Sequence, residues 1–522
     1  MNTLLSSRLA ILQSHPGVLE SIQRGIEKEG LRVDVHGRLS MDPHPIALGS
    51  ALTHPRITTD YSEALLELIT GTHTRVDALI GEIDLIHRIT VSGLGQELIW
   101  NHSMPAHLPS EKDIPIAWYG TSNSAMLKHV YRKGLAERYG KTMQCIAGLH
   151  YNFSFDETFW TLLDIPGQTE SEKRSAGYIS LIRNFTRYSW LLMYLFGASP
   201  AVSSNFLRGR DAGLERLDDD TFYLPHATSL RMSDLGYQNK AQSSLKPCYN
   251  DLPTFLSRLY EAVTTPWPDY EKIGTHRDGH WIQLNTNILQ IENEYYSSIR
   301  PKRTTGPCER PITALAERGV QYIEVRCLDI DPFNRVGITA ESARFVDAFL
   351  LFCALSDSPC FPGNGFCTES AENFSTVVKY GRKPGLLLKR GGQEISMQAY
   401  AHDLMMGIAD CASQLDLALG DDRYQASLKV QLEKLSHSEL TPSARLLDVL
   451  KTEKRSFHEL ALRQSQQHVQ SLRSSGLTTD ETKLANREAR ESIDDQQKME
   501  QSDKISFDEY VRQFHAALKR PN

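Results

Sequence analysis

The chain has 522 residues, of which 40% are hydrophobic and 23% are charged, values that are ordinary for a soluble globular protein. Its 57 lysines and arginines against 64 aspartates and glutamates give a net charge of −7, which argues against nucleic acid as a partner. No apolar run approaches the roughly 20 residues that a membrane-spanning helix needs. Residues 1–17 predict a short helix ending near Pro16, not a signal peptide, so we expect a cytoplasmic protein without a membrane partner.

The first chemically informative stretch is residues 25–32, Gly-Ile-Glu-Lys-Glu-Gly-Leu-Arg, which we interpret as a β-strand. Because side chains alternate along a strand, Glu27 and Glu29 share one face and lie about 6.6 Å apart. Two neighbouring carboxylates repel each other unless cations or protons lie between them, and this spacing suits two adjacent ions. The alternative for the pair alone is a solvated edge strand, balanced by the basic residues around it.

The segment Ile57–Thr70 fits two structures. As a strand it places Glu67 between Leu65 and Ile69 on one face, whereas as a helix it aligns Asp60 with Glu67. In both cases Glu67 lies in an apolar setting, which is unusual for an unpaired carboxylate.

Residues 145–154, Cys-Ile-Ala-Gly-Leu-His-Tyr-Asn-Phe-Ser, show the cleanest alternation in the chain and predict a strand. One face is apolar, and the other carries His150 and Asn152 among small residues. Such a strand packs on a core and presents a site to solvent. Residues 319–329 predict another strand, with Glu324 and Arg326 opposite an apolar face. Helices are predicted over residues 74–99, 124–138, 170–196, 252–264 and 339–354, and from about 398 onward, with residues 474–522 as a solvated helical end.

These segments together predict a site for a hard cation. A sheet face that gathers several carboxylates with one histidine suits Mg²⁺ or Mn²⁺ better than zinc, and such clusters usually hold substrate phosphates. The chain has no GxxxxGK[ST] loop and no GxGxxG after a strand, which excludes P-loop and Rossmann sites. Arg326, with Lys302 or Arg303, would help to neutralise the phosphates of a nucleotide.

The chain resembles bacterial glutamate–cysteine ligase (γ-glutamylcysteine synthetase) of the enterobacterial type in a series of segments that follow in order over roughly residues 20–350. Four of them are Gly-Ile-Glu-Lys-Glu-Gly-Leu-Arg (25–32), Ile-Thr-Thr-Asp-Tyr-Ser-Glu-Ala-Leu-Leu-Glu (57–67), Gly-Leu-His-Tyr-Asn-Phe-Ser (148–154) and Tyr-Ile-Glu-Val-Arg-Cys-Leu-Asp (322–329).

The resemblance implies a glutamine-synthetase-like α+β fold, in which a curved antiparallel sheet forms a funnel surrounded by helices. It also implies that the protein uses ATP to join L-glutamate, through γ-glutamyl phosphate, to the amine of L-cysteine, in the first step of glutathione synthesis. Glutathione is then expected as a feedback inhibitor, because it would share the glutamate and cysteine subsites. We expect a catalytic domain over residues 1–397 and a helical C-terminal region over residues 398–522, packed on it or extending from it.

Carried over position by position, the resemblance assigns roles to individual side chains. Arg326 would face the transferred phosphate. The metal ligands would be Glu27, Glu29, Asp60, Glu67, His150 and Glu324. The positions associated with amino-acid substrates are Tyr131, Arg231, Tyr237 and Tyr296, with Gln144 and Asn152 as nearby candidates.

Two alternatives stay open. A related ligase that uses glutamate with a different amine acceptor would release ADP fastest with that amine. A non-catalytic metal- or nucleotide-binding regulator on the same fold would bind Mg-ATP without turnover and would tolerate Glu324→Gln. The intact set of acids on all the matching segments argues against the regulator.

Overall fold

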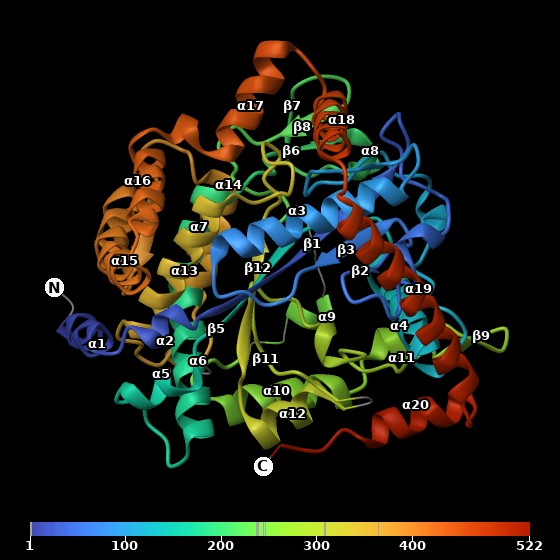
Figure 1. Cartoon of the computed structure of the whole chain (residues 1–522), viewed down its shortest axis with the longest axis horizontal. Helices are drawn as coiled ribbons and strands as arrows, with labels where there is room; N and C mark the ends of the chain where they lie inside the picture. Colours follow the sequence, from blue (N-terminus) through green and yellow to red (C-terminus); the bar gives the residue numbers. More distant parts are fainter. Residues whose placement is uncertain are drawn as a thin grey trace.

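The computed structural model describes residues 3–235, 240–243, 245, 247–306, 309–363 and 365–521. An antiparallel sheet runs through the middle of the molecule in the strand order β11–β12–β5–β1–β3–β2, and β4 pairs with the end of β1 (Figure 1). The α+β prediction is therefore confirmed. The strands are β1 (Gln23–Val33), β2 (Ile57–Thr59), β3 (Leu65–Ile69), β4 (Leu98–Ile99), β5 (Leu149–Ser154), β11 (Ile299–Lys302) and β12 (Tyr322–Leu328).

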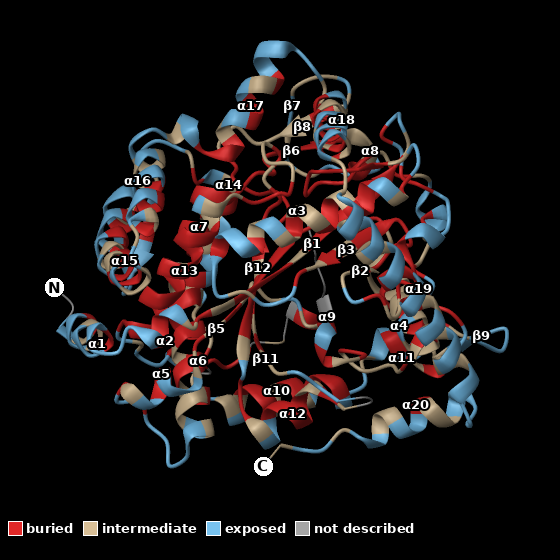
Figure 2. Cartoon of the chain, in the orientation of Figure 1, coloured by how far each residue is buried: buried red, intermediate tan, exposed pale blue. Residues whose placement is uncertain are grey.

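Helices surround this sheet, and Figure 2 shows that their outer faces are exposed while the strands between them are buried. Up to β12 the helices are α1 (Thr3–Gln13), α2 (Gly17–Glu20), α3 (Val76–Gly93), α4 (Asn123–Tyr139), α5 (Glu157–Leu162), α6 (Glu170–Tyr188), α7 (Trp190–Phe196), α8 (Ser204–Leu207), α9 (Lys240–Ser243), α10 (Leu252–Thr264), α11 (Pro268–Ile273) and α12 (Pro311–Arg318). After β12 they are α13 (Ala340–Leu355), α14 (Thr368–Tyr380), α15 (Met397–Leu419), α16 (Arg423–Ser436), α17 (Pro442–Glu453), α18 (Phe457–Ser475), α19 (Thr479–Ser502) and α20 (Phe507–Ala516). In the described part of the chain, no helix has the length and apolarity that crossing a membrane requires.

Smaller elements complete the fold. A three-stranded sheet and two hairpins are formed by β6 (Ala201–Ser203), β7 (Glu215–Arg216) and β8 (Thr221–Tyr223), by β9 (His276–Arg277) and β10 (His280–Trp281), and by β13 (Leu387–Arg390) and β14 (Gln393–Ser396). Short 3₁₀ turns are η1 (Ile46–Leu48), η2 (Glu111–Asp113), η3 (Met143–Cys145), η4 (Glu292–Glu294) and η5 (Ser438–Leu440).

Long-range pairing decides the segments whose local pattern was ambiguous. Of the two structures considered for residues 57–70, the strand is correct and the helix is wrong, because β3 pairs with β1 and β2 pairs with β3. The strand predicted over residues 145–154 begins only at Leu149, since Gly148 gives its N–H to the Glu29 carboxylate rather than to a strand partner. The helix predicted over residues 74–99 ends at Gly93, and Leu98–Ile99 joins β1 instead.

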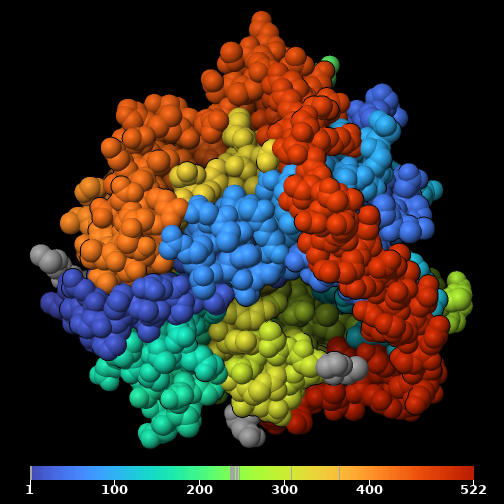
Figure 3. Space-filling view, in the orientation of Figure 1, coloured from blue at the N-terminus to red at the C-terminus, as the bar shows by residue number. Residues whose placement is uncertain are grey.

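The C-terminal helices pack against the rest of the chain. α15 and α16 lie on α13, α18 lies on α3, and one hydrophobic core extends from Leu5 of α1 to Leu472 of α18. Residues 479–516, which we call the C-terminal strap, contain α19 and α20, and α19 crosses the first hundred residues on the face shown in Figure 3. The division at residue 397 stays a prediction.

Lys28 lies between Glu27 and Glu29 on β1 but points to the opposite face, where it is fully buried. Its amino group has no hydrogen-bond partner among the described residues. Burial alone lowers the pKa of Lys28 to about 7 from an ordinary value of 10.5. Folding therefore removes this amine from water without giving it a hydrogen-bond partner among the described residues, which lowers the stability of the folded protein.

Replacing Lys28 by methionine is expected to stabilise the protein at pH 7, because the stem stays packed and the buried amine is removed. Between pH 7 and 10 the unfolded chain binds this proton and the folded chain does not, so the free energy of unfolding of the wild type rises with pH. In urea unfolding, the difference in free energy of unfolding between the variant and the wild type should decrease by about 3–4 kcal/mol between pH 7 and 10. Lys429→Met, at an exposed position of α16, is the control. An advantage that does not change with pH would contradict the expectation.

Candidate functional site

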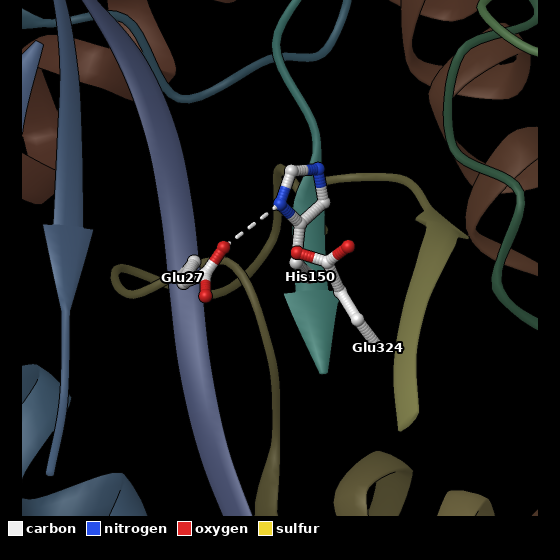
Figure 4. Close-up of side chains that lie close together, drawn as sticks. All are labelled: Glu27, His150 and Glu324. Carbon is white, nitrogen blue, oxygen red and sulfur yellow. Dashed lines mark hydrogen bonds and ion pairs between the residues drawn. The ribbon is translucent and has the colours of Figure 1, made fainter. Parts of the chain in front are cut away.

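One face of the central sheet gathers the predicted acids. Cross-strand register places Glu29 opposite Glu67 and Glu27 opposite His150, and Glu324 follows on the next strand opposite Asn152. Figure 4 shows Glu27, His150 and Glu324 pointing toward one another from three strands. Ligand atoms lie within 4.8 Å of one another in two overlapping groups, Glu27–His150–Glu324 and Glu29–Glu67–His150.

Crowding among these carboxylates shifts their affinity for protons. Burial, followed by the charges of Glu27 and Asp60, holds the pKa of Glu67 well above its usual range. Burial likewise raises the pKa of Glu29, although the backbone N–H of Gly148 donates to its carboxylate. At Glu27 burial acts in the same direction, but the hydrogen bond from His150 at 3.2 Å and the charges of His150 and Lys302 together outweigh it and lower the pKa. Protons or metal ions must therefore compensate the negative charge at the Glu67 end.

The opposite end of the site is rich in cations. Arg326, Lys302 and Arg300 lie 3.3, 3.5 and 3.9 Å from the Glu324 carboxylate, and together they outweigh its burial and hold its pKa well below the usual range. Burial, with Arg326 nearby, lowers the pKa of Arg300 to about 10. Three cations beside one carboxylate leave positive charge available for an anionic ligand.

Two cavities open on this face and share Asp60, Tyr131, His150 and Arg326 in their linings. The cavity of about 280 Å³ is also lined by Glu27, Glu67, Lys302 and Glu324, and Glu29 lines both cavities. The cavity of about 150 Å³ is lined by most of the residues predicted to bind amino acids, namely Tyr131, Gln144, Arg231 and Tyr296.

The remaining predicted residues lie elsewhere. Asn152 is not among the residues that line the two cavities, but its amide donates to Glu27 at 2.9 Å and so orients that carboxylate. Arg303 points away and donates to the carbonyls of Arg318 and Gly319. Asp60 lines both cavities without belonging to either ligand group. Tyr237 falls outside the described residues.

Three cationic residues of the site were missed from the sequence. Arg300 shares its face of β11 with Lys302, and the alternation of that short strand would have favoured Arg300 over Arg303. Lys128 and Arg132 come from α4, one turn before and directly after Tyr131, and both line the larger cavity. Burial lowers the pKa of Lys128 to about 8.

The side chains present fit a hard divalent cation. The donors are carboxylate oxygens and one imidazole, which is the chemistry that Mg²⁺ and Mn²⁺ accept. One oxygen of Glu324, Oε2, is buried without a hydrogen-bond partner among the described residues. The raised pKa of Glu67 shows in addition that this end lacks positive charge.

Comparisons with known proteins show which family the chain resembles over its length. The family model described as glutamate-cysteine ligase matches residues 9–377. The chain is 64% identical to a glutamate–cysteine ligase of Bordetella parapertussis over 98% of its length and 97% of the relative, and 55% identical to that of Pseudomonas aeruginosa over 99% of each. A crystal structure of glutamate–cysteine ligase from Francisella tularensis in complex with AMP matches 95% of this chain and 98% of its own at 38% identity, with a TM-score of 0.89. Since the model spans well over half of the chain and the relatives match it nearly end to end, the chain belongs to the glutamate–cysteine ligase family.

Proposed function

We propose that the protein uses ATP to join L-glutamate, through its γ-carboxylate, to the amine of L-cysteine, giving γ-glutamylcysteine, ADP and phosphate. This is the first step of glutathione biosynthesis. The observation that carries the proposal is the sheet face on which two overlapping carboxylate–histidine groups adjoin three cations. The family membership and the AMP complex of a solved relative support ATP as the co-substrate.

We propose Mg²⁺, with Mn²⁺ as a substitute, as the metal of this site. When bound, it would withdraw charge from the ATP phosphates and align the γ-phosphoryl group. Asp60 lines the same cavities as the two ligand groups, and we include it among the ligands. The proposed ligands are Glu27, Glu29, Asp60, Glu67, His150 and Glu324.

The cations of the site would activate the phosphoryl group for attack. A carboxylate is a poor electrophile, so the γ-carboxylate of glutamate must first become an acyl phosphate. Arg326 offers a planar fork of donors that can hold the negative charge developing on the transferred group. Lys302 and Arg300 lie beside the same carboxylate, Glu324, and would neutralise the remaining phosphates. The amine of cysteine then attacks γ-glutamyl phosphate, and phosphate leaves.

The smaller cavity would hold the amino acids. Arg231 is fixed by hydrogen bonds to the backbone carbonyls of Arg326 at 2.9 Å and Leu328 at 3.3 Å, so its guanidinium is held in place before a substrate carboxylate arrives. Gln144 Nε2 is buried and has no partner among the described residues, which leaves a donor for a substrate. Tyr131 and Tyr296 belong to the same lining.

We extend the proposal to regulation and location. Glutathione carries the same γ-glutamyl and cysteinyl parts as the product, so it would compete for the smaller cavity and inhibit. The cytoplasm, which supplies ATP and reduced cysteine, would be the place of the reaction.

A coupled assay of ADP release tests the activity. Purified protein with Mg²⁺, ATP and glutamate should release ADP only when cysteine is added, with equal γ-glutamylcysteine by mass spectrometry. ADP released with another amine would keep the metal site and change the acceptor. Binding of Mg-ATP without turnover on any acceptor would refute the proposal and favour a regulator.

Replacing Gly148 by alanine is expected to raise the KM for glutamate about 10- to 100-fold, the value of a lost charge-assisted hydrogen bond. A Cβ atom at this position would lie 2.0 Å from Arg231 Nη2, so the guanidinium has to move. The backbone N–H to Glu29 stays, and Mn²⁺ affinity should not change. Gly17→Ala is the control for the loss of a glycine, because a Cβ there meets nothing within 4 Å and its backbone, like that of Gly148, is not left-handed. An unchanged KM would remove Arg231 from the substrate-binding residues.

A further inference from the structure

The C-terminal strap contacts both of the segments that bring Asp60 and Tyr131 to the site. Ahead of Asp60, Arg56 forms an ion pair with Glu488, and the backbone N–H of Ser50 donates to Ser492 Oγ at 3.0 Å. These contacts lie on α19 and bind the loop that leads into β2. The strap thus fixes the approach to the Asp60 turn from outside the sheet.

The same strap holds the beginning of α4. The backbone N–H of Thr121 donates to the Glu500 carboxylate at 2.8 Å, and that of Asn123 donates to Asp503 Oδ2 at 2.5 Å. The Asn123 amide also donates to the carbonyl of Ile505 at 3.0 Å. The first N–H groups of a helix have no partner inside the helix and favour negative charge, so Asp503 stabilises the N-terminus of α4 at its first residue, Asn123. Glu500 holds Thr121, which lies just before the N-cap residue.

Farther along, α20 packs behind the wall of the larger cavity. Val511 is only 2% exposed and lies in one apolar cluster with Val130 of α4 and Leu284. Leu284 is also part of the lining of the larger cavity, and its carbonyl accepts a hydrogen bond from His515 of α20, so α20 packs on a residue of the cavity wall. Asp508 accepts a hydrogen bond from Trp281 Nε1 at 2.8 Å and anchors the start of α20.

We propose that the C-terminal strap positions α4 and the Asp60 turn against each other, with Asp503 as a positioning residue for substrate binding. The two segments meet inside the site, where Arg132 Nε donates to the carbonyl of Asp60. If α4 shifts along its axis, Tyr131 and Arg132 move relative to Asp60 in both cavities. The inference rests on the proposed function where it concerns substrates, and on the strap contacts alone where it concerns α4.

Three variants of the full chain test the inference. Asp503→Ala removes the acceptor, Asp503→Asn keeps an oxygen acceptor for the Asn123 N–H, and Asp494→Ala changes an exposed acid on α19 as a control. Hydrogen exchange of amides 123–132 measures the hold on α4 without any activity. Steady-state kinetics gives KM and kcat, and Mn²⁺ binding monitors the metal site.

Asp503→Ala is expected to speed exchange of the first α4 amides at least threefold and to raise the KM for glutamate or ATP about 3- to 10-fold. The affinity for Mn²⁺ should stay unchanged, because Asp503 contacts the start of α4 and not the Asp60 turn, and the other proposed ligands lie on sheet strands. Asp503→Asn should bring the exchange rate and the KM most of the way back to the wild-type values. Unchanged exchange at α4 would overturn the inference outright. Faster exchange with an unchanged KM would reduce the strap to a stabilising role. A wild type without cysteine-dependent turnover would refute the proposed function, while the exchange result would still decide whether the strap holds α4.

Discussion

Replacing Glu324 by glutamine is expected to lower kcat about 10²- to 10³-fold and to weaken Mn²⁺ binding, while the fold stays intact. Glu324 is buried, and its side chain faces His150 and Glu27 on one side and Arg326 on the other. Glutamine keeps the volume and one oxygen but removes the negative charge that a metal ion and Arg326 both need. The loss of one such electrostatic group costs about 3–4 kcal/mol in the transition state.

The measurement is steady-state release of ADP together with titration of Mn²⁺ into the protein. Glu394→Gln, at an exposed position of the β13–β14 hairpin, makes the same chemical change away from the site. It should leave kcat and the affinity for Mn²⁺ unchanged. Turnover of the Glu324 variant within twofold of the wild type would show that this carboxylate is not a ligand. A nucleotide-binding regulator would instead bind Mg-ATP without turnover, and its binding would tolerate the same substitution.

Replacing Asp347 by alanine is expected to lower the free energy of unfolding by about 3–5 kcal/mol, because it breaks a buried ion pair. Arg24 of β1 and Asp347 of α13 are both fully buried, with 2.6 Å between Nε and Oδ2. The hydroxyls of Tyr151 and Tyr424 donate to the same carboxylate at 2.8 and 3.0 Å. The variant leaves a guanidinium and two hydroxyls in the core without their acceptor.

The loss of stability could come from the unpaired guanidinium or from lost packing. Urea unfolding of the single variant and of the double variant Arg24→Met/Asp347→Leu separates these two causes. The double variant has no uncompensated charge and should recover most of the stability, since apolar replacements of buried pairs are often neutral. A single variant within 1 kcal/mol of the wild type would mean that water reaches the guanidinium of Arg24. A double variant as unstable as the single one would assign the loss to packing.

Alternation along single strands was enough to predict the charged sheet face of the site, whereas the residues of the smaller cavity came from the family resemblance. Glu27 with Glu29, His150 with Asn152, and Glu324 with Arg326 were each placed on one face from period two alone, and the sheet brings those faces together. Which strands are neighbours could not be predicted in this way, because pairing joins distant residues, such as Glu27 with Ile69 and Asn152 with Glu324.

Short or polar segments did not allow the positions and contacts of their side chains to be predicted. β11 has four residues, too few to show that Arg303 lies past its end and points away. The polar residues 474–522 predicted a solvated helical end, and helices are present. Their contacts with Thr121, Asn123 and Leu284 are hydrogen bonds to distant backbone groups, for which a charged helix carries no signal.

The two faces of β1 carry opposite charge, and this has a consequence for folding. Acids at positions 27 and 29 face the ligand site, while Arg24, Lys28 and Arg32 are buried on the other side, two of them in ion pairs. A slip of one residue in the pairing of β1 would exchange the faces, so that carboxylates entered the core and cations occupied the ligand positions. Each misaligned state therefore combines several buried charges without partners. The same alternation of charge that places carboxylates at the ligand site therefore raises the free energy of the misaligned pairings of β1.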